Sequence, residues 1–153
     1  MCHLYKGDLL YHELLRGNLY PLYDSLWYNG VEMMRYWAPL PVYFIALCDA
    51  LAGGSVAYAY LVFVGLICFL GALVWLRIGC IYERPFMGAF LGVLWFFMPN
   101  NLFAMFEEGN LPRSLCMVLL PLFVYYVYSY LSDYKWLSLP KMIVVFSLMA
   151  LCH

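Results

Sequence analysis

The stretch VAYAYLVFVGLICFLGALVWL, residues 56–76, runs for 21 residues without a charged side chain and ends at Arg77. A helix rises about 1.5 Å per residue, and the hydrocarbon core of a bilayer is about 30 Å thick. As a helix, this stretch is therefore long enough to cross a membrane, and it predicts a transmembrane span.

Two further uncharged runs follow, over residues 86–106 and 114–132. Pro99 lies inside the first run and Pro121 inside the second. A proline bends a membrane helix and frees a backbone carbonyl, which a neighbouring group must then satisfy. A last apolar segment, residues 142–152, is only about half a span long, so we expect the chain to be truncated there. The expected membrane helices are 56–77, 86–106, 113–131 and a truncated 140–153.

The composition agrees with a membrane environment. Hydrophobic residues make up 67% of the 153 residues and charged residues 11%, whereas soluble domains are roughly half apolar and about a quarter charged. We therefore expect an all-α fold, a multi-pass transmembrane helical bundle in the cell membrane, with membrane lipids among its partners. The net charge of −1 offers no electrostatic basis for binding nucleic acid.

The N-terminal part of the chain has a different pattern, with charges at helical spacing. If residues 8–16 form a helix, Asp8, His12 and Arg16 fall within an arc of about 80°, at about 100° per residue. The opposite side carries Leu10, Tyr11, Leu14 and Leu15. This arrangement is typical of an amphipathic helix that lies in the membrane interface, apolar side down.

A short apolar segment, from Tyr36 to Cys48, comes next. Its 13 residues are too few to span a bilayer, and Pro39 stands near its start. We expect an interfacial or re-entrant helix entered through Pro39, and we expect Asp49, which ends the segment, only to mark the interface. Residues 1–55 are thus predicted to form an extracytoplasmic, interfacial loop with amphipathic and re-entrant helices, and residues 56–153 the transmembrane part.

Several short motifs occur in an order that is typical of one protein family. They include the blocks NGxExxRYWAPLP over residues 29–41 and EEGNLPRSL over residues 107–115. On these motifs the chain resembles the multi-pass membrane family labelled 6-pyruvoyl-tetrahydropterin synthase-related. More broadly, it resembles the first part of the GT-C architecture of membrane glycosyltransferases. Zinc-dependent pterin chemistry is not expected, because no three histidines share a helical face.

The GT-C resemblance implies a specific chemistry. Such proteins place an acidic residue in the first extracytoplasmic loop, just after a first transmembrane helix, and they transfer a sugar from a polyprenyl-phosphate donor to an extracytoplasmic acceptor. Asp8 matches that acid by position. The preceding helix is absent from this sequence, so the resemblance also implies that this polypeptide alone is not a competent enzyme.

Asp8 has two interpretations. As a site residue, it would act as a general base, or it would ligate a divalent cation that neutralises the phosphate of the donor. As a structural residue, it would be the N-cap of the amphipathic helix, a position that Asp favours. The sequence leaves both interpretations open.

Six further residues are candidates. Glu32 is a candidate second catalytic acid, and the candidates for binding substrate are His12, Arg16, Arg35, Glu107 and Glu108. A guanidinium group suits bidentate contacts with phosphate, but arginine also anchors helices at an interface. The two glutamates could form a carboxylate pair at a span end, or they could belong to a solvated loop that Gly109 and Asn110 close.

A second class of function competes with sugar transfer. The chain could be a non-catalytic membrane module in the assembly or transport of cell-surface polymers. A transporter is expected to place ionisable residues or broken helices near the middle of the membrane. In this sequence the acids stand at span ends, and only the Pro99-Asn100-Asn101 stretch indicates a broken helix.

Overall fold

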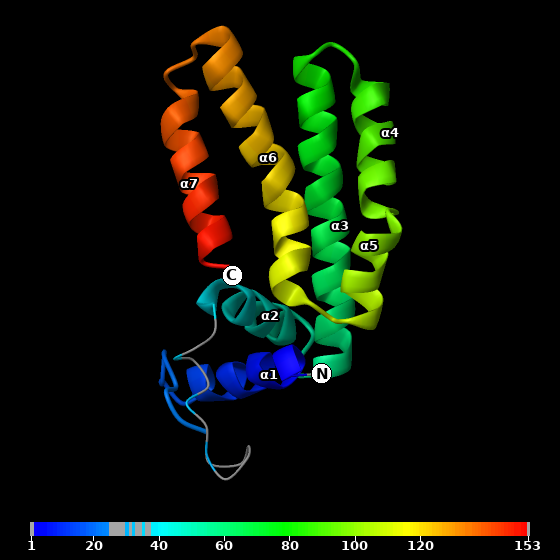
Figure 1. The fold of residues 1–153 in the computed structure, drawn as a ribbon. Coiled ribbons are helices and arrows are strands. Elements are labelled where there is room, and N and C mark those ends of the chain that lie inside the picture. The colour runs from blue at the N-terminus through cyan, green and yellow to red at the C-terminus, as the bar shows by residue number, and fades with distance from the viewer. Residues whose placement is uncertain (1, 25–29, 31, 33–34, 36–37, 153) are drawn as a thin grey trace.

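The computed structural model describes residues 2–24, 30, 32, 35 and 38–152, and the regular elements in these ranges are all helical (Figure 1). This confirms the prediction of an all-α fold. The helices are α1 (Cys2–Leu15), α2 (Pro39–Leu51), α3 (Val56–Ile81), α4 (Pro85–Phe96), α5 (Pro99–Leu102), the π-helical η1 (Phe103–Glu107), α6 (Leu111–Asp133) and α7 (Ser138–Ala150).

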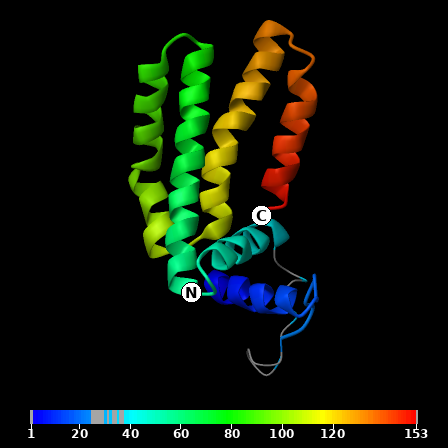
Figure 2. The same cartoon turned by 180° about the vertical axis from the view of Figure 1, so that it is seen from behind.

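Helices α3 and α6 are long and apolar enough to cross a membrane. The bent pair of α4 with α5–η1 would be a third span if it crosses as one unit. Helix α3 continues for about one turn beyond the expected end at Arg77, to Ile81. Figures 1 and 2 show α3, α4, α6 and α7 running side by side, with α3 and α4 joined at one end of the bundle and α6 and α7 joined at the same end.

Glycines let α3 and α4 approach each other closely. A Cβ atom built on Gly79 would lie 2.8 Å from the Cα atom of Gly88, and one on Gly88 would lie 2.6 Å from the carbonyl oxygen of Trp75. No larger residue fits at this crossing without movement of a backbone. Small residues at helix contacts are typical of membrane bundles, because close approach of the backbones increases van der Waals contact.

The second expected span is not one straight helix. Helix α4 ends at Phe96, and the following α5–η1 unit is bent from it by 57°. Pro99 lacks an N–H, so the carbonyl of Trp95, four residues earlier, loses its helical donor. The Nδ2 atom of the buried Asn101 donates to that carbonyl oxygen at 2.6 Å. The asparagine therefore satisfies the group that the proline frees.

The proline inside α6 has a similar partner. Pro121 deprives the carbonyl of Met117 of its helical donor, and the Nε1 atom of Trp95 donates to that oxygen at 3.0 Å. The expectation that neighbours satisfy the freed carbonyls thus holds at both prolines. In each case the donor is a side chain of the α4–α5 region.

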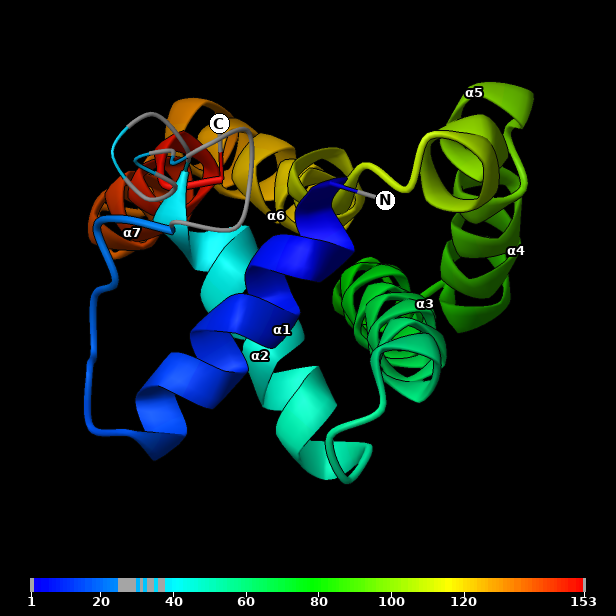
Figure 3. The same cartoon turned by 90° about the horizontal axis from the view of Figure 1, so that it is seen from below.

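Helices α1 and α2 lie across the ends of the long helices, on the side where α3 and α6 begin (Figures 1 and 3). They cross where Gly7 meets Ile45, since any Cβ atom on Gly7 would overlap the side chain of Ile45. Leu10, Val42 and Ala46 form a small buried cluster between them. Helix α2 begins at Pro39, within the segment expected to run from Tyr36 to Cys48. Residues 36 and 37 lie outside the described ranges.

Helix α1 differs from its expected bounds, and this decides the structural interpretation of Asp8. The helix begins at Cys2, so Asp8 lies in its interior and is not an N-cap. Leu10 is completely buried, as the amphipathic pattern predicts, but Leu15 is 69% exposed. Tyr11 and Leu14, on the same face, pack against the cluster of Leu10 with α2, whereas Leu15 lies outside it.

Candidate functional site

Three ionisable side chains meet at the crossing of α1 and α2. The Nε2 atom of His12 lies 3.4 Å from Oδ1 of Asp8, one helical turn earlier on α1. Asp49 reaches the same place from α2, where its carboxyl group interacts with both Asp8 and His12. The structure thus brings the predicted residues Asp8 and His12 together with an acid from a different helix.

Asp49 is the most buried of the three. It is only 1% exposed, and neither of its carboxylate oxygens accepts a hydrogen bond from a donor among the described residues. A buried carboxylate without donors is costly in free energy, because it loses its hydration without replacement. A group in this position is expected to hold a proton.

The electrostatics agree with that expectation. Burial raises the pKa of the Asp49 carboxyl group, and the negative charge of Asp8 raises it further, while His12 acts in the opposite direction. The two acids therefore differ in environment: Asp49 is buried and tends to be neutral, whereas Asp8 is 30% exposed at its side chain and lies beside a histidine.

The described side chains at this crossing do not form a metal site. In the described part of the chain, no group of three or more His, Cys, Asp or Glu side chains is arranged to hold a metal ion. The expectation that Asp8 could ligate a divalent cation therefore finds no companion ligands here. The groups that this site offers for chemistry are two carboxyl groups and one imidazole.

Arg16 does not join this group in the structure. Its Nη1 atom donates to Oε1 of Glu13 at 2.8 Å, and Nδ2 of Asn18 donates to the other oxygen of Glu13 at 2.9 Å. The hydrogen bond from Asn18 and the one from Arg16 lower the pKa of the Glu13 carboxyl group. Arg16 thus takes part in an exposed network at the C-terminal end of α1.

Glu32 and Arg35 pair with each other. The Nη1 atom of Arg35 lies 2.7 Å from Oε2 of Glu32, and both side chains are exposed. The sequence suggested separate roles for them: Glu32 as a second catalytic acid and Arg35 as a cation that binds phosphate. In the structure the acid is partly neutralised by the base, so a role for either residue requires this exposed ion pair to open.

Glu107 and Glu108 lie at the end of η1, on the same side of the bundle as α1 and α2 (Figure 1). Nδ2 of Asn110 donates to Glu108 at 3.3 Å, and a nitrogen of Arg113 lies 3.8 Å from the same carboxylate. Asn110 also caps α6, since its Oδ1 atom accepts from the N–H of Arg113 at 3.1 Å. Glu108 therefore belongs to the tight connection into α6, and Glu107 is exposed.

Sequence reasoning did not select Asp49 as a site residue. The available signal was that it is the one charged residue in the 13 residues of α2. A single acid in an apolar segment does not show which face of the helix another element covers. Asp49 could therefore equally well have been a residue that lies at the membrane interface. Only the crossing with α1 places it beside Asp8.

Comparison with known proteins identifies one family. The family described as "6-pyruvoyl-tetrahydropterin synthase related domain; membrane protein" matches residues 34–153. No curated protein and no solved structure matches the chain. The match includes Asp49 and the glutamates of the loop before α6, and it begins after Asp8 and His12.

Proposed function

Because this chain belongs to the 6-pyruvoyl-tetrahydropterin synthase related family of membrane proteins, we propose that it is part of a membrane-embedded glycosyltransferase with a GT-C-like architecture. The reaction would transfer a sugar from a polyprenyl-phosphate donor to an acceptor on the extracytoplasmic side. The observation that carries this proposal is the pair of carboxyl groups, Asp8 and Asp49, at the crossing of two helices that lie across the ends of the membrane helices.

The two acids have different environments, since Asp49 is buried and the side chain of Asp8 is partly exposed. Pairs of carboxyl groups whose surroundings separate their pKa values are a common basis of acid–base catalysis. Burial and the charge of Asp8 raise the pKa of the Asp49 carboxyl group and so favour its neutral form, and in this proposal Asp8 acts as the base. Asp8 is also the more accessible of the two, so it is the one that an acceptor hydroxyl group can reach.

The proposed step is a displacement at the anomeric carbon of the donor sugar. Asp8 accepts the proton of the acceptor hydroxyl group as the new bond forms between the acceptor oxygen and the anomeric carbon. The bond between that carbon and the phosphate oxygen breaks, and polyprenyl phosphate leaves with the electron pair. His12 lies beside Asp8 and can stabilise its charge when the imidazole is protonated.

The remaining candidates act by binding in this proposal. Arg16 and Arg35 would exchange their glutamate partners for the phosphate of the donor, a contact that guanidinium groups favour. Glu32 is then a second acid once Arg35 is released. Glu107 and Glu108 stand at the same end of the bundle and would contact hydroxyl groups of the acceptor or the sugar.

A non-catalytic role in the assembly or transport of surface polymers is the second candidate. The bend of 57° between α4 and α5–η1 favours it, because transporters often bind their substrates at discontinuous helices. Two polar groups near this bend are engaged, however: Asn101 binds the carbonyl of Trp95, and the hydroxyl group of Tyr60 donates to the carbonyl of Met105.

The test is the substitution Asp8→Asn in the intact protein, assayed in membranes with a polyprenyl-phosphate sugar. Transfer should fall by about 10²–10⁴-fold, which is the usual contribution of a general base. Folding should be retained, since Asn matches the shape of Asp and removes a charge that opposes Asp49. Glu83→Gln, at the turn between α3 and α4, is the control and should keep its activity.

Normal transfer by a well-folded Asp8→Asn protein would exclude Asp8 as the base. If instead the wild-type protein transfers no sugar, while its deletion blocks export of a surface polymer, the second candidate is correct.

A further inference from the structure

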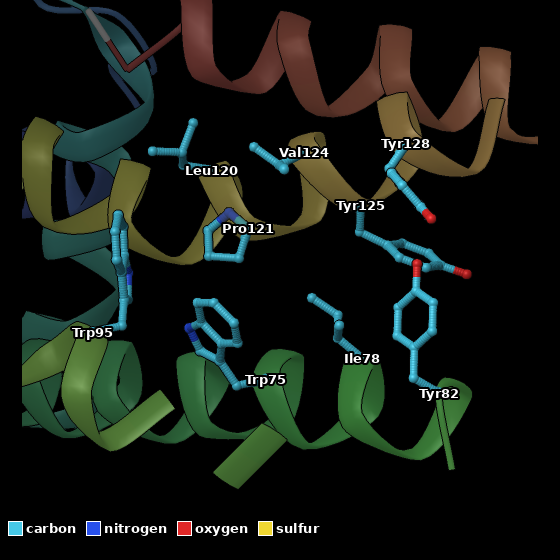
Figure 4. A pocket seen from close by; sticks show the side chains of 9 residues that line it. All are labelled: Trp75, Ile78, Tyr82, Trp95, Leu120, Pro121, Val124, Tyr125 and Tyr128. Atoms are coloured by element: carbon cyan, nitrogen blue, oxygen red, sulfur yellow. The ribbon is translucent and has the colours of Figure 1, made fainter. Parts of the chain in front are cut away.

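Helix α6 has a different neighbour on each side (Figure 4). Towards α3 there is an apolar groove, lined in part by Trp75, Trp95 and Pro121. On the other side α6 packs against α7, and the two helices form an antiparallel hairpin with a short connection (Figures 1 and 2). Two cysteines belong to this hairpin: Cys116 lies near the start of α6, and Cys152 lies just after the end of α7.

The register of this hairpin brings the two cysteines to the same level. Side-chain contacts join the helices at three successive levels: Ser129 with Ser138, Tyr126 with Lys141, and Phe123 with Phe146. At each level, a move back along α6 is matched by a similar move forward along α7. Continuing seven residues back from Phe123 and six residues forward from Phe146 leads to Cys116 and Cys152.

The two thiol groups meet where this register predicts. They lie close enough to form a hydrogen bond with each other. Cys152 is completely buried, and Cys116 packs against the core cluster to which Cys152 belongs. Two cysteines can form a disulfide only where their side chains meet in this way. The pair was not visible in the sequence, because the two residues lie far apart in the chain.

The surroundings of the pair decide which chemistry suits it. A structural zinc site takes about four ligands, and in the described part of the chain no group of three or more His, Cys, Asp or Glu side chains could hold a metal ion. The N–H of Leu40 in α2 donates to the carbonyl oxygen of Leu151 at 3.3 Å, so the pair lies at the end of the bundle that α1 and α2 cover. Under the proposed function this end faces the extracytoplasmic side, where disulfides form and persist.

We propose that Cys116 and Cys152 form a disulfide bond, an inference that rests on the sidedness in the proposed function. The oxidant is the disulfide of an extracytoplasmic thiol–disulfide oxidoreductase. The thiolate of one cysteine attacks that disulfide, and a mixed disulfide forms. The thiolate of the other cysteine then attacks the mixed disulfide and releases the oxidoreductase as a dithiol. The two cysteines thus lose two electrons and two protons, which the oxidoreductase takes up.

The bond stabilises the hairpin at the end remote from its connection. It links the end of α7 to the first turns of α6 and closes a loop that contains the connection between them. A cross-link of this kind restricts the unfolded chain and so favours the folded one. Because Cys152 is buried in the folded protein, the exchange precedes the packing of α2 against the end of α7.

Differential alkylation of the intact protein tests this proposal. Membranes are denatured in the presence of a maleimide that blocks free thiols, and the protein is then reduced and labelled with a second, heavier maleimide. Mass spectrometry should find the second label on Cys116 and Cys152, and should find their two peptides joined before reduction. Cys68 and Cys80, both exposed on α3, should carry the first label.

Variants confirm the pairing. Cys116→Ser and Cys152→Ser should each leave the other cysteine of the pair with the first label, whereas the matched control Cys68→Ser should leave the pair unchanged. In detergent, dithiothreitol should lower the unfolding temperature of the wild type by several degrees and should not affect the double serine variant. The labelling of the wild type needs no variant, so the test holds even if a serine variant does not fold.

The first label on both cysteines of the wild-type protein would overturn the proposal. A disulfide from either of them to Cys48, the buried cysteine of α2, would overturn it too. The labelling is independent of sugar transfer. Free thiols in a protein that transfers sugar would therefore reject the disulfide alone, and a Cys116–Cys152 disulfide in a protein that transfers none would reject sugar transfer alone.

Discussion

At the scale of single residues, the candidate site contains one buried carboxyl group, that of Asp49, which is packed among apolar side chains. Asp49 shares α2 with the buried Ile45 and Cys48, and it faces Asp8 across the helix crossing. Two charged carboxylates at this position would repel each other in a medium of low dielectric constant. The raised pKa of Asp49 is therefore a property of the folded structure, and the stability of the protein should depend on pH through this group.

Asp49→Asn should change how stability depends on pH. The pKa of Asp49 is raised in the fold above its value in the unfolded chain, which is about 3.9. The stabilising contribution of the protonated carboxyl group is therefore complete below about pH 4 and is lost as the pH rises through the raised folded pKa. Asn stays neutral, so the variant should be more stable than the wild type at pH 8, with a difference that shrinks towards pH 4.

Thermal unfolding in detergent between pH 4 and 8 would measure this difference. The Glu13→Gln variant is a useful comparison, because the pKa of Glu13 is lowered, and its contribution is instead lost as the pH falls. Parallel curves for the wild type and Asp49→Asn would show that Asp49 is hydrated and ionised in the folded protein.

At the scale of helices, two prolines interrupt the backbone hydrogen bonds of the apolar helices. Side chains elsewhere donate to the carbonyls that the prolines leave free. Pro121 and Pro99 were visible in the sequence, and each was expected to bend its helix and free a carbonyl. Which groups would compensate was not predictable, because the donor to Met117 comes from Trp95 on another helix. Nothing in the local sequence of α6 encodes that contact.

Trp95→Phe should destabilise the protein by about 1 kcal/mol, because it keeps an aromatic ring but leaves the carbonyl of Met117 without a donor. Pro121→Ala restores an N–H to α6, which can donate to the same carbonyl. In that background, Trp95→Phe should therefore cost much less. Reversible unfolding of the four proteins of this double-mutant cycle measures the coupling.

An equal cost of Trp95→Phe in both backgrounds would contradict a role for the hydrogen bond. It would mean that the indole stabilises the bundle through its size or through its contact with Trp75.

At the scale of the whole molecule, the charged residues divide between the two ends of the bundle. Helices α1 and α2 and the glutamates before α6 lie at one end, and the turns at Glu83 and Lys135 lie at the other (Figures 1 and 2). If these two ends lie on opposite sides of a membrane, the bent pair of α4 and α5–η1 crosses it as one span. The sidedness of single residues therefore tests the whole arrangement.

Single cysteines should report this arrangement in a background without native cysteines. A membrane-impermeant thiol reagent should label Asn18→Cys and Glu107→Cys from one side of the membrane, and Glu83→Cys and Lys135→Cys only from the other. All four residues are exposed, so labelling reports sidedness and not burial. Labelling of Glu107→Cys and Glu83→Cys from the same side would show that α4 and α5–η1 form a re-entrant loop.

Composition and length were enough to predict which segments are helices that can span a membrane. A run such as residues 56–76 has no charged side chain, and a backbone in hydrocarbon must satisfy its own hydrogen bonds, so its local structure follows from the sequence. The short amphipathic helix near the N-terminus was visible for a similar reason, in the spacing of Asp8 and His12.

How these segments meet became apparent only in the folded chain. The interior position of Asp8 in α1 follows from a helix that begins at Cys2, and its proximity to Asp49 follows from the crossing at Gly7 and Ile45. The groove between α3 and α6 likewise depends on contacts between distant helices, since side chains of α3, α4 and α6 line it. Contacts of this kind depend on the packing of residues far apart in the chain, and periodicity within one segment carries no information about the partner that covers it.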